Sequence, residues 1–237
     1  MIGTIVNAGS IILGGIVGLF VGKKIKDHYQ QSINKALGIA VMILGLNGVI
    51  TSMITGDKNG VLSSSGELLL IISLILGVFV GEILRIDERL NHLSSVVEKK
   101  FKLTGFSSSF MNGTLIYCVG AMAIVGALND GIRNDASVLL VKSLLDGISS
   151  IVLAATLGPG VIFSALPVFL YQGAISLLAG LLESYLSAQL LAQICAVGYC
   201  LVLCIGMNFV FDSKIKTANM LPALLVPIIW SGIQIFL

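Results

Sequence analysis

Two charged residues inside an apolar segment are the first candidates for chemistry. Lys142 and Asp146 lie within residues 135–160, DASVLLVKSLLDGISSIVLAATLGPG, a segment long and apolar enough to cross a bilayer. Residues four apart share one face of a helix, so both charges point the same way. An ionisable side chain at membrane depth costs at least about 2.5 kcal/mol, so we expect this face to line a bundle interior or a wet cavity.

The chemistry open to this pair is ion or solute binding. Asp146 can take up a proton or coordinate a sodium ion, and Lys142 can neutralise the carboxylate or bind an anionic group. The alternative is an ion pair that only fixes helix packing, but a buried pair is weak evidence for stability. We therefore favour a ligand site that also draws on polar side chains of other expected spans. Its candidate residues are Asp146, Lys142, Ser143, Ser149, Ser150, Asn7, Asn47, Gln172 and Asn208.

The residue inventory argues against an enzyme. The two histidines, His28 and His92, fall in expected loops, so the membrane segments offer no Ser-His or Cys-His pair. No second carboxylate is expected at the depth of Asp146, and the four cysteines lack the paired spacing of a metal site. Glycine-rich segments lack the lysine of a phosphate-binding loop. We predict a protein without catalytic residues, metal or cofactor.

Composition predicts the class of protein that must position these residues. Hydrophobic residues make up 56% of the 237 and charged residues only 11%, against roughly 25% charged in soluble domains. We predict an all-α, polytopic transmembrane helix bundle that forms one domain, residues 1–237, with the lipid bilayer as its main partner. Without a basic tract carrying aromatic residues, nucleic acid is not an expected partner. The first apolar segment lacks the features of a cleaved signal peptide and is expected to be retained.

A hydropathy window of about 19 residues predicts about eight spans. The expected spans are residues 2–22, 34–54, 67–86, 110–129, 136–156, 161–182, 188–211 and 218–236. Residues 158–160, Gly-Pro-Gly, are either a turn between two spans or a re-entrant break. Pro167 removes a backbone donor and is expected to kink the sixth span near its middle.

The distribution of basic residues predicts an orientation in a bacterial inner membrane. Most loop lysines and arginines follow the first, third and seventh spans, and only Lys58 and Arg133 lie in loops on the opposite side. The positive-inside rule then places the basic loops in the cytoplasm and both termini outside it. At the outer end of the fourth span, we expect Asp130 and Asp135 to lie in a solvated loop.

Two further patterns concern packing and the surface. Residues 87–103 have apolar residues at helical spacing between charges, which predicts an amphipathic linker helix on the cytoplasmic surface. Gly14, Gly18 and Gly22 repeat every four residues in the first span, which predicts a smooth strip for close helix packing. Such strips serve contacts within one chain and contacts in a homodimer equally well.

A weak internal repeat links the two ends of the chain. NAGSIILGGIV from Asn7 aligns with QGAISLLAGLL from Gln172, and GLN at 45–47 aligns with GMN at 206–208. Spans one to three then correspond to spans six to eight in the opposite orientation, which is an inverted repeat of the kind found in secondary transporters. Chance similarity between apolar segments is the competing interpretation.

Four motifs carry a resemblance to a known family: IGTIVNAGSIILGGIVG, CVGAMAIVGALNDG, KSLLDGISSIVLA and GPGVIFSALPVFLYQGA. With them the chain resembles, over essentially its whole length, the uncharacterised bacterial inner-membrane family of the YqgA and YdfK type. The resemblance implies a polytopic inner-membrane protein with a role related to transport. It carries over no catalytic or ligand residue, because the family is a domain of unknown function.

These observations favour a secondary transporter of an ion or small polar solute, with a site near the midplane around Lys142 and Asp146. An ion channel or pore is the first alternative, and a transporter differs from it by saturating and by responding to a coupling gradient. A non-transporting membrane scaffold or regulator is the second. In that case residues 87–103 would be the working part, and Asp146 would be dispensable.

Overall fold

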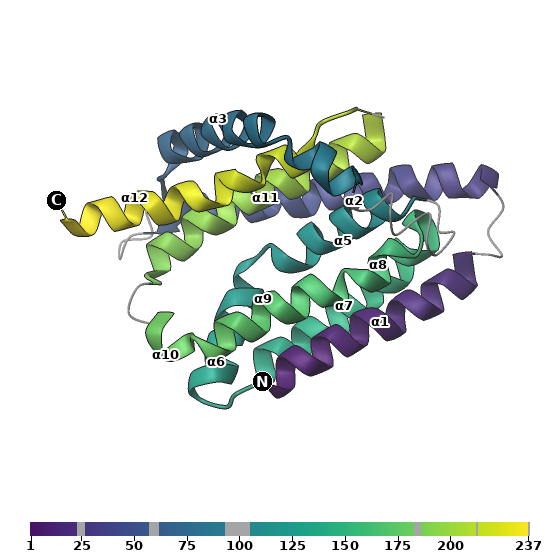
Figure 1. The fold of residues 1–237 in the computed structure, drawn as a ribbon, viewed down its shortest axis with the longest axis horizontal. Coiled ribbons are helices and arrows are strands. Elements are labelled where there is room, and N and C mark those ends of the chain that lie inside the picture. Colours follow the sequence, from purple (N-terminus) through teal and green to yellow (C-terminus); the bar gives the residue numbers. More distant parts are fainter. Residues whose placement is uncertain (23–26, 57–61, 93–104, 183–185, 212, 237) are drawn as a thin grey trace. The chain divides into compact units, whose positions relative to one another are not determined.

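The computed structural model describes residues 1–22, 27–56, 62–92, 105–182, 186–211 and 213–236, and these residues are mainly helical (Figure 1). A two-stranded antiparallel hairpin, β1 (Ile54–Gly56) with β2 (Leu62–Ser64), lies between the second and third helices. The predicted all-α bundle is confirmed. Its helices are α1 (Ile2–Gly22), α2 (Asp27–Met53), α3 (Glu67–Leu84), α5 (Phe106–Cys118), α6 (Ala121–Ile132), α7 (Ser137–Leu157), α8 (Gly160–Phe163), α9 (Ala165–Leu177), α10 (Ala179–Leu182), α11 (Ala188–Phe211), the 3-10 helix η1 (Thr217–Leu224) and α12 (Leu225–Phe236).

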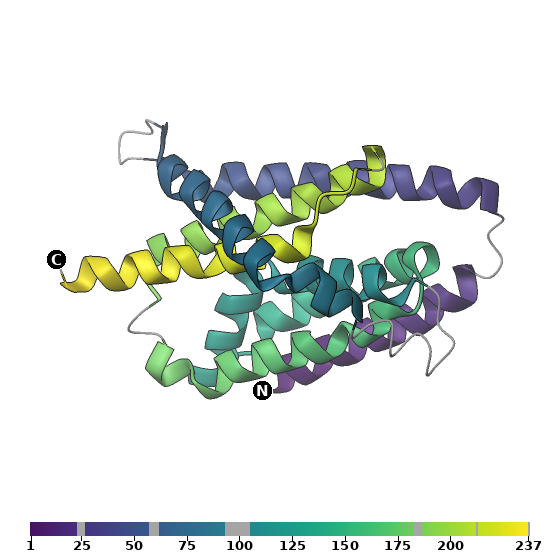
Figure 2. The same cartoon turned by 45° about the horizontal axis from the view of Figure 1, so that its top comes forward.

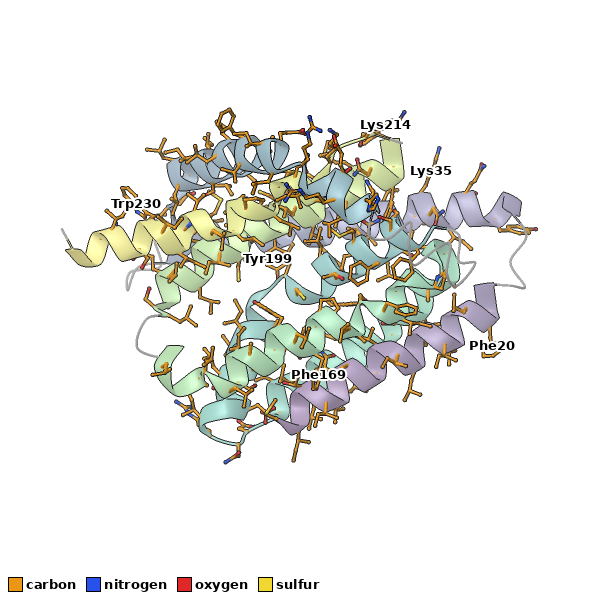
Figure 3. The ribbon with its side chains drawn as sticks, viewed as in Figure 1. Phe20, Lys35, Phe169, Tyr199, Lys214 and Trp230 are labelled. Carbon is orange, nitrogen blue, oxygen red and sulfur yellow. The ribbon has the colours of Figure 1, made fainter. Side chains whose placement is uncertain are left out.

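Seven of the described helical segments are long and apolar enough to cross a membrane, or eight if the bent pair α5 and α6 is counted as one span. The exposed side chains of these helices are largely apolar, among them Phe20, Phe169 and Trp230 (Figure 3). Leu13 on α1 and Phe79 on α3 are 67% and 64% exposed. Such surfaces are stable in lipid, whereas in water they would form large apolar patches. The chain is therefore a membrane protein.

Contacts divide the described chain into two compact units. The first unit holds residues 1–34 and 91–185, and the second holds residues 35–90 and 186–237. Residues 86–92 are helical, while the remainder of the expected linker helix, 93–103, lies outside the described residues. The expectation of a single domain stays a prediction.

Helices α1 and α7 pack side by side in the first unit (Figures 1 and 2). Gly14, Gly18 and Gly22 lie against α7, where a Cβ on each would come within 2.2 to 2.6 Å of a backbone oxygen. The absence of that atom lets the two backbones approach closely, with Cα hydrogens facing carbonyls. The facing carbonyls are, in the same order, those of Gly147, Ile151 and Ala155.

This order of contacts shows that α1 and α7 run in the same direction. The expected span at residues 110–129 is observed as two helices, α5 and α6, which are bent by 62° to one another and form a broken span when they are taken together.

The segment at residues 158–160 is a turn between two spans. Asn7 bonds to Gln172, and a Cβ on Gly15 would meet Ile162, so positions rise along α1 as they fall along α8 and α9. The α8–α9 segment therefore runs antiparallel to α1 and α7. Of the two interpretations of this segment, the structure supports the turn.

The sixth span is interrupted closer to its start than Pro167 alone predicts. Helix α8 ends at Phe163, and α9 begins at Ala165, so Pro167 is the third residue of α9. A proline in the first turn of a helix is tolerated because its missing N–H has no partner there anyway. Pro227 has the corresponding place in α12, which begins at Leu225.

The second unit is also held by close glycine contacts. A Cβ on Gly77 of α3 would collide with Ala223 of η1, and a Cβ on Gly81 would collide with Asn219. Figure 2 shows α3 crossing η1. Gly45 of α2 lies against α11 in the same way. The predicted inverted repeat between the two ends of the chain is not confirmed by this architecture and stays a prediction.

Candidate functional site

The Lys142–Asp146 pair lies on the buried face of α7, inside the first unit. The two side chains are 8% and 9% exposed, and Nζ lies 2.9 Å from each carboxylate oxygen. Only the contact with Oδ1 has the geometry of a hydrogen bond, so Oδ2 accepts none. The helical spacing of the two residues produces the pair, and the packing of α1 on α7 keeps it away from the exposed surface.

Helix α1 brings a fully buried amide to this pair. Asn7 is 0% exposed, and its Nδ2 donates to Oε1 of Gln172 on α9 over 3.3 Å. The same amide lies beside the Asp146 carboxylate. Three helices of the first unit, α1, α7 and α9, thus contribute polar side chains to one site.

The broken span reaches the same place. Tyr117, the penultimate residue of α5, is fully buried, and its hydroxyl lies 2.7 Å from Oγ of Ser150. Ser150 donates its one hydroxyl hydrogen to the backbone carbonyl of Asp146 over 2.7 Å. Tyr117 must therefore be the donor in the hydrogen bond between the Tyr117 and Ser150 hydroxyls. Cys118 lies within electrostatic range of both Lys142 and Asp146. The end of α5 therefore faces the charged pair.

Four buried polar atoms in this region have no hydrogen-bond partner among the described residues: Thr4 Oγ1, Asn7 Oδ1, Asp146 Oδ2 and Gln172 Nε2. Leaving a buried neutral polar group unpaired costs about 1 to 3 kcal/mol, while Asp146 Oδ2 keeps its ion-pair contact with the Lys142 ammonium. Native cores rarely keep several such atoms in one region without a purpose. Asn7 Oδ1 and Asp146 Oδ2 are acceptors, Gln172 Nε2 is a donor, and the Thr4 hydroxyl can be either, so the site offers both kinds of group to a ligand.

The remaining candidates of α7 have more local roles. Ser143 is buried, and its hydroxyl donates to the Leu139 carbonyl over 2.6 Å, while Ser149 is half-buried. Ser150 links Asp146 to Tyr117, as described above. A serine that bonds back to its own helix leaves its oxygen available as an acceptor.

Two predicted residues, Asn47 and Asn208, belong to the second unit. The side chain of Asn47 is exposed on α2. Asn208 orders the segment after α11: its Nδ2 donates to the Ile215 carbonyl, and its Oδ1 accepts from Ile215 N and from the Ser213 hydroxyl, all at 2.9 to 3.0 Å. The first unit thus brings together Asn7, Lys142, Asp146, Ser150 and Gln172 and does not include these two asparagines.

Asp130 differs from the expectation of a solvated loop. Its side chain is 3% exposed; Oδ1 accepts from the Met1 ammonium over 2.9 Å and Oδ2 from the Gly3 amide over 3.1 Å. The carboxylate is buried because it neutralises the positive amino end of α1. Asp135 is exposed as expected. The Ser137 backbone amide donates a hydrogen bond to its carboxylate, and this bond holds the pKa of Asp135 below its usual value.

Sequence reasoning missed Thr4 and Tyr117 as members of this region. Both are fully buried. For Tyr117, the signal available in the sequence was the nearby Gly120. In the structure this glycine adopts φ 120° and ψ 149°, a backbone conformation that only glycine adopts readily. A glycine inside an apolar span indicates where the helix can break, and the residues just before the break are the ones presented to the interior.

The comparisons with known proteins place the chain in a family. Residues 2–232 match the family described as "Protein of unknown function (DUF554)". The chain belongs to this family. It is 37% identical over 227 residues to "Uncharacterized membrane protein YdfK" of Bacillus subtilis (strain 168), covering 96% of this chain and 94% of YdfK.

A second relative is more distant but equally complete. "Uncharacterized protein YqgA" of Escherichia coli (strain K12) is 24% identical over 233 residues, which cover 95% of this chain and 94% of YqgA. No solved structure matches the chain. The resemblance drawn from the sequence motifs is confirmed. The name of YdfK describes a membrane protein, and neither relative's name assigns an activity.

Proposed function

We propose that this DUF554 protein is a secondary transporter of an ion or small polar solute across the bacterial inner membrane, and that Lys142 and Asp146 form its central site. The observation that carries the proposal is the buried charged pair beside the break between α5 and α6. Broken spans that converge with buried charges are the common construction of transporter sites, because helix ends offer polar backbone groups where hydrocarbon would otherwise surround them.

The cost of the pair supports a functional role. Taking an ammonium and a carboxylate out of water carries a penalty of several kcal/mol per ion, and a well-packed apolar pair is often equally stable. The unpaired atoms around it add to this cost. A site that binds and releases a polar ligand explains why these groups are kept at the interior of the first unit.

The orientation forms part of the proposal. We propose that the basic loops face the cytoplasm, because most loop lysines and arginines lie on one side of the predicted topology. The protein then acts without catalysis, cofactor or nucleic acid, with the bilayer and its solute as partners. The channel and scaffold alternatives become outcomes of the experiment.

The experiment that tests the proposal is thermal unfolding of the purified protein in detergent, in the presence of sodium, potassium, varied pH and a panel of metabolites. A ligand that binds only the folded form raises the melting temperature. At a ligand concentration of a hundred times its Kd, the free energy of unfolding increases by about 2.7 kcal/mol. We expect a specific shift in the wild type that is lost in Asp146→Asn. Asp135→Asn, which changes an exposed carboxylate, is the matched control and should keep the shift.

An uptake assay then separates transport from binding alone. The ligand found by thermal unfolding is placed across the membrane of proteoliposomes, with and without a pH gradient. Saturable uptake that depends on Asp146 supports a secondary transporter. Current without saturation points to a pore, and the absence of both a ligand shift and uptake contradicts a transport site.

A further inference from the structure

The polar atoms around Asp146 have the chemistry of a cation site. Oδ2 of Asp146 and Oδ1 of Asn7 are buried and accept no hydrogen bond among the described residues. The Nδ2 end of the Asn7 amide faces the carboxylate, so rotation of this amide by half a turn brings its Oδ1 to the same place. Both oxygen atoms are hard, one with a negative charge and one with the negative end of an amide dipole. Carboxylate and carbonyl oxygens are the ligands that hard metal cations prefer in proteins.

The end of α5 lies near the charged pair and carries backbone oxygens of the same kind. The helical hydrogen bonds of α5 end with the Val119 amide bonded to the Leu115 carbonyl over 3.0 Å, and Gly120 then turns the chain away. The carbonyls that follow Leu115 lie beyond this last bond, at the negative end of the helix dipole. Tyr117 and Cys118 place this end near the charged pair.

The charge of the site selects the valence of the ion. In the described part of the chain, the site has one negative charge, that of the Asp146 carboxylate, and one positive charge, that of the Lys142 ammonium, so the two charges cancel. Among the described residues, no three histidine, cysteine, aspartate or glutamate side chains gather in a cluster that could hold a metal ion. A monovalent ion can replace the ammonium charge for charge, whereas a divalent ion would leave a buried excess of positive charge.

We propose that Asp146, Asn7 and the carbonyl end of α5 bind a small monovalent metal cation of the sodium class, and that the Lys142 ammonium competes with this cation for Asp146. The inference rests on the proposed function, since it names the ligand class of the same site. The Lys142 ammonium lies 2.9 Å from both carboxylate oxygens and thus stands where the cation binds. Cation entry then requires the ammonium to move away, which couples binding to a rearrangement of α7 side chains.

The test measures the melting temperature of the full-length protein in detergent while NaCl replaces choline chloride at constant ionic strength. In the wild type, we expect sodium but not choline to raise the melting temperature. Lys142→Met keeps the length of the side chain and removes the competing charge. Its half-maximal sodium concentration should therefore be at least about tenfold lower than that of the wild type, equivalent to about 1.4 kcal/mol.

Two further variants keep the test decisive if Lys142→Met folds poorly. Asp146→Asn removes the anionic ligand and should abolish the sodium shift. The double variant Lys142→Met with Asp146→Asn carries an uncharged pair of nearly the same shape, so it should fold and show no sodium response. A double variant that still responds to sodium would overturn the assignment to Asp146.

A structural ion pair gives a different pattern. Lys142→Met would then be destabilised, equally in NaCl and in choline chloride, and the wild type would show no sodium shift. That result overturns the cation site. A wild-type melting temperature that follows pH but not sodium also overturns it, because the ligand would then be the proton.

The two proposals fail separately. If sodium has no effect but a metabolite gives an Asp146-dependent shift and saturable uptake, transport stands and the cation inference falls. If sodium binds as expected but proteoliposomes show neither sodium flux nor sodium-driven uptake, the cation site stands and the transport proposal falls.

Discussion

Asn7 and Gln172 lie 165 residues apart in the chain and are joined by a hydrogen bond of 3.3 Å, with Nδ2 of Asn7 as the donor. The same offset aligns the two segments of the predicted repeat. Their helices run antiparallel, as the two copies of an inverted repeat must. In an inverted repeat, only residues next to the two-fold axis contact their own equivalents. The bond joins the first residues of the two aligned segments, but it does not confirm the inverted repeat, which stays a prediction for the whole chain.

A double-mutant cycle on this bond should reveal coupling. Asn7→Ala and Gln172→Ala should each lower the free energy of unfolding by about 1 to 3 kcal/mol, because each leaves a buried amide without its partner. The double variant should be more stable than the sum of the single effects predicts, by about 0.5 to 2 kcal/mol. Equilibrium unfolding in mixed detergent measures these values.

The control for that cycle pairs Asn7→Ala with Asn208→Ala. Asn208 bonds to Ser213 and Ile215 and shares no hydrogen-bond partner with Asn7. The two effects should add to within about 0.5 kcal/mol. Equal coupling in both cycles would mean that the Asn7–Gln172 bond has no special role.

The α1–α7 contact predicts opposite outcomes for two glycines of one helix. A Cβ on Gly14 would lie 2.2 Å from the Gly147 oxygen, whereas a Cβ on Gly9 would meet nothing within 4 Å. We expect Gly14→Ala to lower the free energy of unfolding by about 1 to 3 kcal/mol, as overpacking does. Gly9→Ala should leave it unchanged or raise it by up to about 1 kcal/mol, because alanine favours the helix. A similar loss in both variants would contradict the close contact.

The hydrogen-bond chain from Tyr117 through Ser150 predicts an unequal pair of effects. Tyr117→Phe removes one donor and leaves the Ser150 bond to the Asp146 carbonyl intact, so it should cost about 1 kcal/mol. Ser150→Ala leaves the buried Tyr117 hydroxyl without its acceptor and should cost more, about 2 kcal/mol. Thermal unfolding of the two variants side by side gives the order. The reverse order would show that Tyr117 donates elsewhere.

Asp130 should be needed for the start of α1. Asp130→Asn keeps the shape but removes the charge that faces the Met1 ammonium and the Gly3 amide, so the free energy of unfolding should fall by about 1 to 3 kcal/mol. Proteolysis near the start of α1 should become faster. Asp135→Asn, at an exposed carboxylate nearby in sequence, is the control, and an equal loss there would rule out a specific role for Asp130.

The sequence by itself determined the class of protein and most of its spans. The length of an apolar segment predicts a membrane helix for two reasons. The bilayer has a fixed thickness, and a backbone in hydrocarbon must satisfy its own hydrogen bonds, as a helix does. The expected bounds of α1 and α11 agree with the structure residue for residue. The pairing of Lys142 with Asp146 also follows from spacing alone, since residues four apart on a helix are neighbours.

Only the tertiary structure decided which other residues join that pair. Asn7, Tyr117 and Gln172 come from three different helices, and hydropathy carries no information about which face of one span meets which face of another. The break at Gly120 and the burial of Asp130 depend on the same contacts. Each polar residue of an apolar span must find a partner, but the identity of that partner is set by the packing of helices distant in sequence.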